Sequence, residues 1–180
     1  MENSELEKSK YPIGKFIAPD NYSDEYIREK INEIATFPER LKSEVLHLTD
    51  EQLDTPYRDG GWTIRQVIHH CADSHINCFV RIKWALTEQN PIIKYYHEDR
   101  WGESPDNLTM PIAPTLLLLE GLHFRLAYLM KNLSNQDLKK SFIHPEHSKE
   151  FKIEEIIGTY AWHGNHHLAH ITALEKRKSW

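Results

Sequence analysis

The segment YAWHGNHHLAHIT, residues 160–172, places four histidines within eight positions. Apolar and aromatic residues recur at helical spacing through this segment and on both sides of it. The pattern predicts one long helix from Ile153 to about Lys178. A helix with an apolar stripe packs against other helices, so part of the histidine row is expected to face them.

The four histidines form two pairs, each with a spacing of four residues. Residues four apart share a face of a helix, so His163 and His167 can direct both rings at one metal ion. His166 and His170 form a second pair, rotated by roughly 60–100° from the first. Only one pair can face the core well, and we expect His166 to be a bystander. Taken alone, a solvated polar face explains the histidines equally well.

Three further segments show the apolar period of long helices. The first begins with Ser23 as its N-terminal cap and continues past Pro38, which can open or kink a helix. The second begins at the capping box TIRQ, residues 63–66, and is expected to end near Leu86. The third is the strongly apolar segment that follows Pro114. Strand signals are essentially absent, so the sequence predicts an all-α, antiparallel-type four-helix bundle, with residues 1–180 forming a single domain.

Two segments outside these helices have compositions of their own. Residues 1–22 contain turn formers and aromatic residues and are expected to form an extended arm packed onto the domain. Residues 88–114 form a long loop between the second and third helices, with Tyr95, Tyr96 and Trp101. Long loops inside compact domains are often lids or binding loops. This loop is therefore a candidate to border a pocket.

The chain contains a weak internal repeat. LTDEQL, residues 48–53, resembles LSNQDL, residues 133–138, and WTIRQVI, residues 62–68, resembles FKIEEII, residues 151–157. If the repeat is real, the bundle consists of two helix pairs related by a pseudo-twofold axis. The second and fourth helices would then occupy equivalent places, with their inward faces in contact.

The composition limits the partners and the compartment. The net charge is −5 and basic residues are scattered, which disfavours binding to nucleic acid. The polar segment MENSELEKSK lacks the pattern of a secretory signal, and the longest aliphatic run, residues 116–119, is far shorter than a membrane span. Cys71 and Cys78 lie too far apart on one helix to pair and are expected to be buried thiols. We therefore expect a soluble cytoplasmic protein with no membrane association.

The second helix offers a third metal ligand. VIHHCADSH, residues 67–75, places His70 and Asp73 on a polar stripe of an otherwise apolar helix. Polar residues in the middle of a bundle helix need partners or a function. The internal repeat places position 70 about one turn from the equivalent of position 163. His70 can therefore join His163 and His167 in a three-histidine site with open positions, which is typical of catalytic metal sites.

Three motifs together are similar to one known family: YPIGKF (11–16), LDTPYRDGGWTIRQVIHHCADSH (53–75) and YAWHGNHHLAHIT (160–172). With them the chain resembles the DinB-like superfamily of helical-bundle metalloproteins, most closely its YfiT branch of metal-dependent hydrolases. In that family the first metal ligand is the second histidine of the HH pair, which falls on His70. The other two ligands fall on His163 and His167. Many relatives read H-R-G-Q where this chain reads HLAH, so no role carries over to His170.

The resemblance implies one divalent metal ion per subunit, Zn²⁺ or Ni²⁺, and a homodimer. It implies two reactions on a small-molecule substrate: hydrolysis, or transfer of a low-molecular-weight thiol such as bacillithiol to an electrophile. Three neutral imidazoles leave the ion with a net positive charge and an open position, which can activate water or a thiol. A stress-linked metal- or ligand-binding protein without turnover is a third interpretation, because it needs only the three histidines.

Other residues are candidates for catalysis and substrate binding. Asp73 lies one turn after the first predicted ligand and could orient a ligand or take a proton, although an ion pair with Arg65 explains it equally well. His170 is a candidate for a base or for a hydrogen-bonding partner of a ligand. Tyr96 and Trp101 are candidates to line the substrate pocket, against the commoner case that they pack the loop onto the bundle.

Two other metal designs fit the sequence less well. Position 164 is glycine, so the HExxH arrangement of zincin-type proteases is absent. E-x-x-H occurs at residues 44–47 and 120–123, as in di-iron carboxylate bundles. That design also needs an inward glutamate on each of the other two helices, where the second offers only Asp73 and the fourth has acids only near its ends. The two E-x-x-H pairs are therefore expected to be surface residues.

Overall fold

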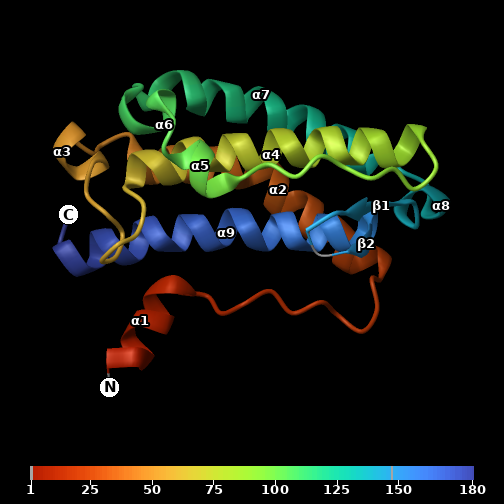
Figure 1. Cartoon of the computed structure of the whole chain (residues 1–180), viewed down its shortest axis with the longest axis horizontal. Coiled ribbons are helices and arrows are strands. Elements are labelled where there is room, and N and C mark those ends of the chain that lie inside the picture. The colour runs from red at the N-terminus through yellow and green to blue at the C-terminus, as the bar shows by residue number, and fades with distance from the viewer. Residues whose placement is uncertain (1, 147) are drawn as a thin grey trace.

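The computed structural model of the protein describes residues 2–146 and 148–180. Four long helices form the predicted bundle, and shorter elements lie at its ends and along its side (Figure 1). In chain order the elements are α1 (Glu2–Lys10), α2 (Asp24–Val45), α3 (Asp50–Leu53), α4 (Ile64–Thr87), α5 (Glu98–Gly102), α6 (Pro105–Thr109), α7 (Ile112–Lys131), α8 (Asn135–Leu138), β1 (Ser141–His144), β2 (Lys149–Lys152) and α9 (Ile153–Lys178). The long helices are α2, α4, α7 and α9.

Capping residues set the start of two long helices as predicted. The Ser23 side chain accepts a hydrogen bond from the backbone N–H of Tyr26, and α2 then continues through Pro38 as one helix. At the start of α4, the Thr63 side chain accepts from the backbone N–H of Gln66, whose side chain accepts from the backbone N–H of Thr63. These bonds satisfy backbone donors that the first turn of a helix leaves free.

Helix α7 is strongly apolar. It begins at Ile112, ahead of the predicted start after Pro114, because a proline in the first turn of a helix costs no intrahelical hydrogen bond. By length and composition alone, α7 is the one helix in the described part of the chain that could cross a membrane. In this structure it packs against α2 and α4. Its outer side exposes large apolar side chains: Leu117, Phe124 and Tyr128.

The two halves of the chain repeat one order of elements, namely a long helix, a short capped helix and a second long helix. The short helices α3 and α8 both begin at a capping box, Thr49 with Gln52 and Ser134 with Asp137. Helix α2 contacts α7, and α4 contacts α9. The internal repeat seen in the sequence therefore corresponds to repeated local structure, with α4 and α9 in contact.

Two apolar clusters fill the bundle, one in each half of its length. Residues of the first cluster include Ile34, Cys78, Leu126 and Ile157, and those of the second include Phe37, Cys71, Leu119 and Ile171. On each long helix a short interval separates the two clusters. On α4, α7 and α9 this interval contains histidines: His75, His123, His163, His166, His167 and His170. Both cysteines are buried and free, as predicted, one in each cluster.

The N-terminal arm is only partly extended. Residues 2–10 form α1, whereas residues 11–23 run along the bundle beside α9 without regular structure (Figure 1). Two hydrogen bonds join the arm to α9: from His170 Nε2 to the Lys10 carbonyl, 3.0 Å, and from Trp162 Nε1 to the Gly14 carbonyl, 3.2 Å. The prediction of a wholly extended arm was wrong, because α1 has almost no apolar face and so lacks the periodicity that reveals the other helices.

The segment between α4 and α7 is not structureless as predicted. It contains α5 and α6, each of five residues, and α6 begins with Pro105 at a position that proline favours. The hairpin of β1 and β2 was also not predicted. Its register pairs Phe142 with Phe151, whose rings stack with centroids 6.1 Å apart. Elements of four or five residues are too short to show a hydrophobic period.

Candidate metal centre

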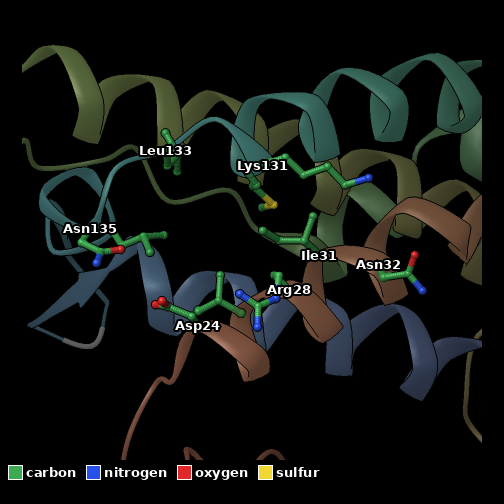
Figure 2. Close-up of a pocket in the computed structure, with 10 residues that line it drawn as sticks. Asp24, Arg28, Ile31, Asn32, Lys131, Leu133 and Asn135 are labelled. Atoms are coloured by element: carbon green, nitrogen blue, oxygen red, sulfur yellow. The ribbon is translucent and has the colours of Figure 1, made fainter.

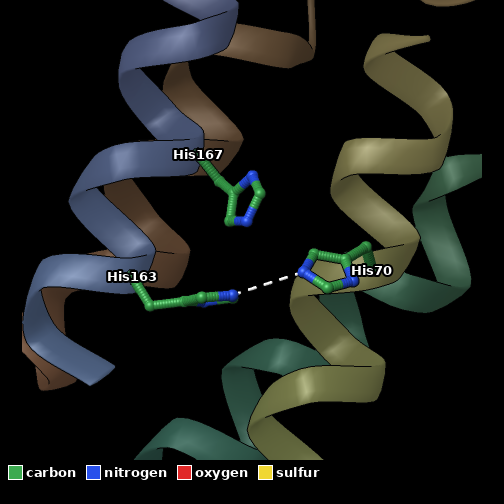
Figure 3. Close-up of side chains that lie close together, drawn as sticks. All are labelled: His70, His163 and His167. Carbon is green, nitrogen blue, oxygen red and sulfur yellow. Dashed lines mark hydrogen bonds between the residues drawn. The ribbon is translucent and has the colours of Figure 1, made fainter. Parts of the chain in front are cut away.

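Helices α4 and α9 bring three histidines together. His70 comes from α4, and His163 and His167 come from adjacent turns of α9 (Figure 3). Their ligand nitrogens all lie within 4.8 Å of one another, and His70 Nε2 is 3.2 Å from His163 Nε2. The structure thus brings together the three residues that the sequence predicted as metal ligands.

Close packing of α2 against α9 fixes the position of this group. A Cβ atom on Gly164 would lie 2.9 Å from Cδ2 of Phe37, so only glycine allows the Phe37 ring to approach α9 here. The same ring packs on His75 and His123, with centroid distances of 5.4 and 5.3 Å. Gly164 therefore has a structural role that the sequence pattern did not reveal.

Behind His163, two further histidines form a chain of hydrogen bonds that ends on the backbone of α2. The distances are 3.0 Å from His163 Nδ1 to His75 Nε2, 2.7 Å from His75 Nδ1 to His123 Nε2, and 2.6 Å from His123 Nδ1 to the Ile34 carbonyl oxygen. We call these four groups the histidine network. His75 and His123 are each 1 % exposed, so water does not compete for these bonds.

The network fixes the tautomer of every ring in it. A carbonyl oxygen only accepts, so His123 Nδ1–H donates to Ile34, and the neutral His123 ring then accepts at Nε2. His75 must therefore donate from Nδ1 to His123 and accept at Nε2 from His163 Nδ1–H. This leaves His163 Nε2 with a lone pair, and that atom faces His70. The network thus presents the His163 nitrogen in the form that binds a metal.

Burial keeps these rings neutral. It lowers the pKa of His70 to about 4, with added repulsion from His166 and His170. Burial likewise lowers the pKa of His123 to about 4, and holds the pKa values of His75, His163 and His167 well below the ordinary range. Neutral imidazole is the form that ligates metals, so the site is ready for a cation at neutral pH.

The donor set fits a divalent ion. Two imidazole nitrogens bound to one tetrahedral Zn²⁺ at 2.0–2.1 Å lie roughly 3.3 Å apart, close to the 3.2 Å between the Nε2 atoms of His70 and His163. Without a metal, His70 Nε2–H is the donor and the His163 Nε2 lone pair is the acceptor of this hydrogen bond. His167 Nδ1 is buried without a hydrogen-bond partner, so that ring is not committed to another group in the described structure.

A cavity of about 420 Å³ borders the three histidines. Its other lining residues are polar or aromatic: Trp62, Ser74, Arg81, Tyr95, Tyr96, Glu98, His144, Glu146 and Tyr160. They come from the loop before α4, from α4 and α9, from the segment that leads into the first residue of α5, and from the hairpin region. The cavity therefore offers a small molecule direct access to the metal-ligand candidates.

A cavity of similar volume, about 410 Å³, lies at another part of the bundle (Figure 2). Its lining includes Asp24, Arg28 and Lys131, which offer a single carboxylate and no imidazole or thiol. This lining cannot form a metal site of the kind seen at the three histidines.

Asp73 lies away from the three histidines. Its Oδ2 accepts a hydrogen bond from Asn107 Nδ2 on α6 at 3.1 Å, and Asp73 is not among the residues that line the cavity. Arg65 does not pair with it, because Arg65 contacts Asp50 and Asp54 instead. Ser74, the next residue, is the one that faces the site, with Oγ 3.5 Å from His163 Nε2.

The second histidine pair of α9 is buried, not solvated. His170 Nε2 donates to the arm as described above, and its ring stacks on Tyr57 with centroids 4.0 Å apart. The His166 ring stacks on Trp162 at 4.5 Å and is 7 % exposed, so it is buried and does not lie on a solvated polar face. Neither residue lines the cavity, and both contact the N-terminal arm or the loop after α3.

The aromatic residues of the long segment divide into two kinds. Tyr96 lines the cavity, and burial raises its pKa to about 12, so it is a neutral hydrogen-bonding group at pH 7. Trp101 is 44 % exposed and packs edge-on against the Tyr96 ring at 5.0 Å, without lining the cavity. Tyr96 thus lies where a pocket residue should, whereas Trp101 supports it from outside.

His75 and His123 are the site residues that sequence reasoning missed. The E-x-x-H pair at residues 120–123 was expected on the surface, yet His123 is fully enclosed. Glu120 fits the expectation, as it forms a partly exposed ion pair with Lys42, and so does His47 of the other pair, whose side chain is 56 % exposed. The available signal was the position of His123 on the most apolar stretch of α7, where a histidine needs a buried partner.

Comparison with known proteins agrees with the fold and with the histidine site. A protein of Oceanobacillus iheyensis is 53% identical over 171 residues, which are 95% of this chain and 98% of the relative. A protein of Bacillus cereus is 49% identical over the same shares. Both carry the name "Putative metal-dependent hydrolase".

A solved structure matches over nearly the whole chain. It is YfiT from Bacillus subtilis, described as a probable metal-dependent hydrolase with an unusual four-helix bundle topology. The TM-score is 0.94 at 43% identity, over 96% of this chain and 99% of that one. The model of the DinB superfamily matches residues 33–171. The chain therefore belongs to the DinB superfamily.

Proposed function

We propose that the protein is a metal-dependent hydrolase of a small molecule, with one divalent ion held by His70, His163 and His167. The observation that carries the proposal is the histidine network, which directs the His163 Nε2 lone pair at His70 Nε2 beside an open cavity. The names given to the relatives support the same reaction class.

The residues around the cavity have separate roles in this proposal. The bound ion supplies Lewis acidity and activates water as a nucleophile. His75 and His123 hold the His163 ring in one tautomer and orientation. Tyr96 and Ser74 offer hydroxyl groups to a substrate in the cavity. Asp73 joins α4 to α6 through Asn107 and so helps to hold the segment that borders the cavity.

Metal analysis tests the ligand set directly. We expect about one divalent ion per chain, and we expect His70→Ala to lose it while His69→Ala, on the same helix but outside the site, retains it. Imidazole suits both Zn²⁺ and Ni²⁺, so both ions are candidates for the native metal, and competition between them ranks their affinities. Full metal content in His70→Ala would contradict the site.

An activity panel separates the three functional interpretations. Ester and amide substrates test hydrolysis, and a thiol with an electrophile tests the thiol-transfer alternative, each with metal-loaded and metal-free protein. Metal-dependent turnover of esters or amides supports the hydrolase, whereas turnover only with the thiol favours the transferase. A protein that binds metal but turns over none of the panel favours the non-catalytic binding protein.

We also propose a homodimer formed through α7. Leu117, Gly121, Phe124 and Tyr128 follow one another at spacings of four, three and four residues, which places them on one face of the helix. The three large side chains are 66 %, 75 % and 68 % exposed. A contiguous apolar stripe of this kind is typical of a protein interface. The two buried free thiols fit a reducing compartment, which supports a cytoplasmic location.

A further inference from the structure

Arg81 is a buried cation whose hydrogen bonds are not satisfied. The residue is 7 % exposed, and its Nε and Nη2 atoms are buried without an acceptor among the described residues. These two nitrogens form one edge of the guanidinium group, with N–H bonds that point in the same direction. Such an edge matches the two oxygens of a carboxylate. Leaving a charged donor pair unsatisfied in the interior is costly, so the pair needs an explanation.

A second buried arginine on the same helix shows what a satisfied edge looks like. Arg65 is 4 % exposed, and its Nε and Nη2 atoms contact Asp54 at 2.6 Å and Asp50 at 2.8 Å. Arg65 and Arg81 are therefore both buried and lie on the same helix. They differ in whether the described chain supplies acceptors for the N–H groups of the guanidinium edge. Arg65 has a structural role, whereas the acceptor for Arg81 is missing from the described chain.

Arg81 borders the same cavity as the three histidines. It follows His70 by 11 positions on α4, which corresponds to about 16 Å along the helix. Side chains of a helix lean toward its N-terminus, so the guanidinium group is directed back toward His70. The Tyr96 ring lies over it, with the guanidinium carbon 5.7 Å from the ring centroid. The cavity thus has metal-ligand candidates and a cation at different points of its wall.

The acids that line the cavity, Glu98 and Glu146, do not occupy the Nε–Nη2 edge of Arg81, because both nitrogens lack an acceptor among the described residues. Glu98 instead accepts a hydrogen bond from the Tyr95 hydroxyl at 3.0 Å. Among the described residues no acceptor reaches the Nε–Nη2 edge of Arg81, so this edge is free to take one from a molecule in the cavity.

We propose that Arg81 binds a carboxylate of the substrate, so that the substrate is a small carboxylic acid whose reacting group lies at the three histidines. This inference rests on the proposed metal site for the position of the reacting group. Arg81 then acts as a specificity residue, because a neutral analogue would leave the guanidinium edge unsatisfied. Tyr96 shields the resulting ion pair from water.

The test compares two thiols of equal length on the Co²⁺-loaded protein, 6-mercaptohexanoate and 6-mercaptohexanol. Their thiolates bind the metal alike, and the change in the Co²⁺ absorption spectrum measures each affinity. We expect the acid to bind roughly 10- to 100-fold more tightly than the alcohol in the wild type, because its carboxylate can pair with Arg81. In Arg81→Met the two affinities are expected to become equal through weaker binding of the acid alone.

Thermal stability gives a readout that does not depend on a ligand. Arg81→Met removes a buried charge with unsatisfied donors, so its melting temperature is expected to equal or exceed that of the wild type. The matched variant Arg65→Met breaks two ion pairs, and its melting temperature is expected to fall. A loss of stability in Arg81→Met as large as in Arg65→Met would show that Arg81 is structural and would overturn the proposal.

Two further outcomes are distinguishable. An acid that binds no better than the alcohol in the wild type, or whose advantage persists in Arg81→Met, refutes the role of Arg81 and leaves the metal site intact. A protein that takes up no Co²⁺ refutes the proposed function instead. In that case hexanoate and hexanol are titrated into the metal-free protein, and intrinsic fluorescence reports their binding. A preference for hexanoate that depends on Arg81 supports the carboxylate site, and the lack of such a preference overturns the carboxylate site.

Discussion

Replacing His75 by phenylalanine tests whether the histidine network controls metal binding. Phenylalanine keeps a ring of similar shape and removes both nitrogens. His163 Nδ1–H then lacks its acceptor, and His123 Nε2 lacks its donor. Each buried group left without a partner costs about 1–3 kcal/mol, so the metal-free variant should lose about 2–6 kcal/mol of unfolding free energy.

The effect on metal affinity is separate from this loss. Without His75, nothing holds the His163 ring in the tautomer that presents Nε2 to the site. Loss of the hydrogen-bond partner of a metal-ligating histidine typically weakens metal binding 10- to 100-fold, which is about 1.4–2.7 kcal/mol. Because ligand binding stabilises the folded state in proportion to the logarithm of its affinity, the stabilisation produced by saturating metal should shrink by the same amount.

Two measurements give these quantities. Competition with a chelator of known affinity gives the Kd for Zn²⁺, and urea unfolding with and without metal gives the stabilisation. His69→Phe is the matched control, because His69 is also buried on α4, with Nδ1 2.7 Å from Thr115 Oγ1 and Nε2 3.1 Å from the Met110 carbonyl. It should lose stability without losing metal affinity. A His75→Phe Kd within about threefold of the wild type would refute the reasoning.

Three other predictions concern the buried histidines, Asp73 and the exposed face of α7. Burial lowers the pKa of both His123 and His170 from 6.5 to about 4. The stability that these neutral rings contribute is therefore complete above pH 6.5 and is lost as the pH falls toward 4, by about 3 kcal/mol for each ring. Urea unfolding of the metal-free protein at pH 7.5, 6 and 5 checks this, and a free energy of unfolding that stays constant would contradict it. Asp73→Asn should change metal affinity less than about threefold, because Asp73 does not contact the three histidines. A larger loss in chelator competition would show that Asp73 contributes to the metal site. Phe124→Glu should convert a dimer into a monomer in light scattering, whereas Ile17→Glu, on the arm and also strongly exposed, should not. A monomeric wild type would remove the basis for the dimer.

Much of the fold could be predicted because the long helices carry their own signals. The capping box and the apolar period placed α4, and the apolar period alone placed α9, to within a few residues of their observed bounds. The elements that were missed are the ones without such a signal. Helix α1 has almost no apolar face, and α5, α6 and the β1–β2 hairpin are too short for one. Their structure depends on contacts with the rest of the bundle.

The site could be predicted only in part, for a related reason. His70, His163 and His167 lie on two helices at spacings that suggest a shared ion, and the internal repeat indicates that those helices meet. The apolar stretch around His123 indicates a buried ring but does not identify its partners, which lie on α4 and α2. Arg81 is a similar case, since only the three-dimensional structure shows that its donor edge has no acceptor.

The position of the histidines between two apolar clusters explains how the bundle tolerates so many polar rings in its interior. Each ring of the network donates one hydrogen bond to the next and remains neutral, so the network ends on a backbone carbonyl without burying a charge. The tautomer that satisfies this order is the one that leaves the His163 Nε2 lone pair facing His70. The hydrogen bonds that make the polar layer compatible with the core therefore also prepare the metal ligand, and a substitution in the network is expected to weaken folding and metal binding together.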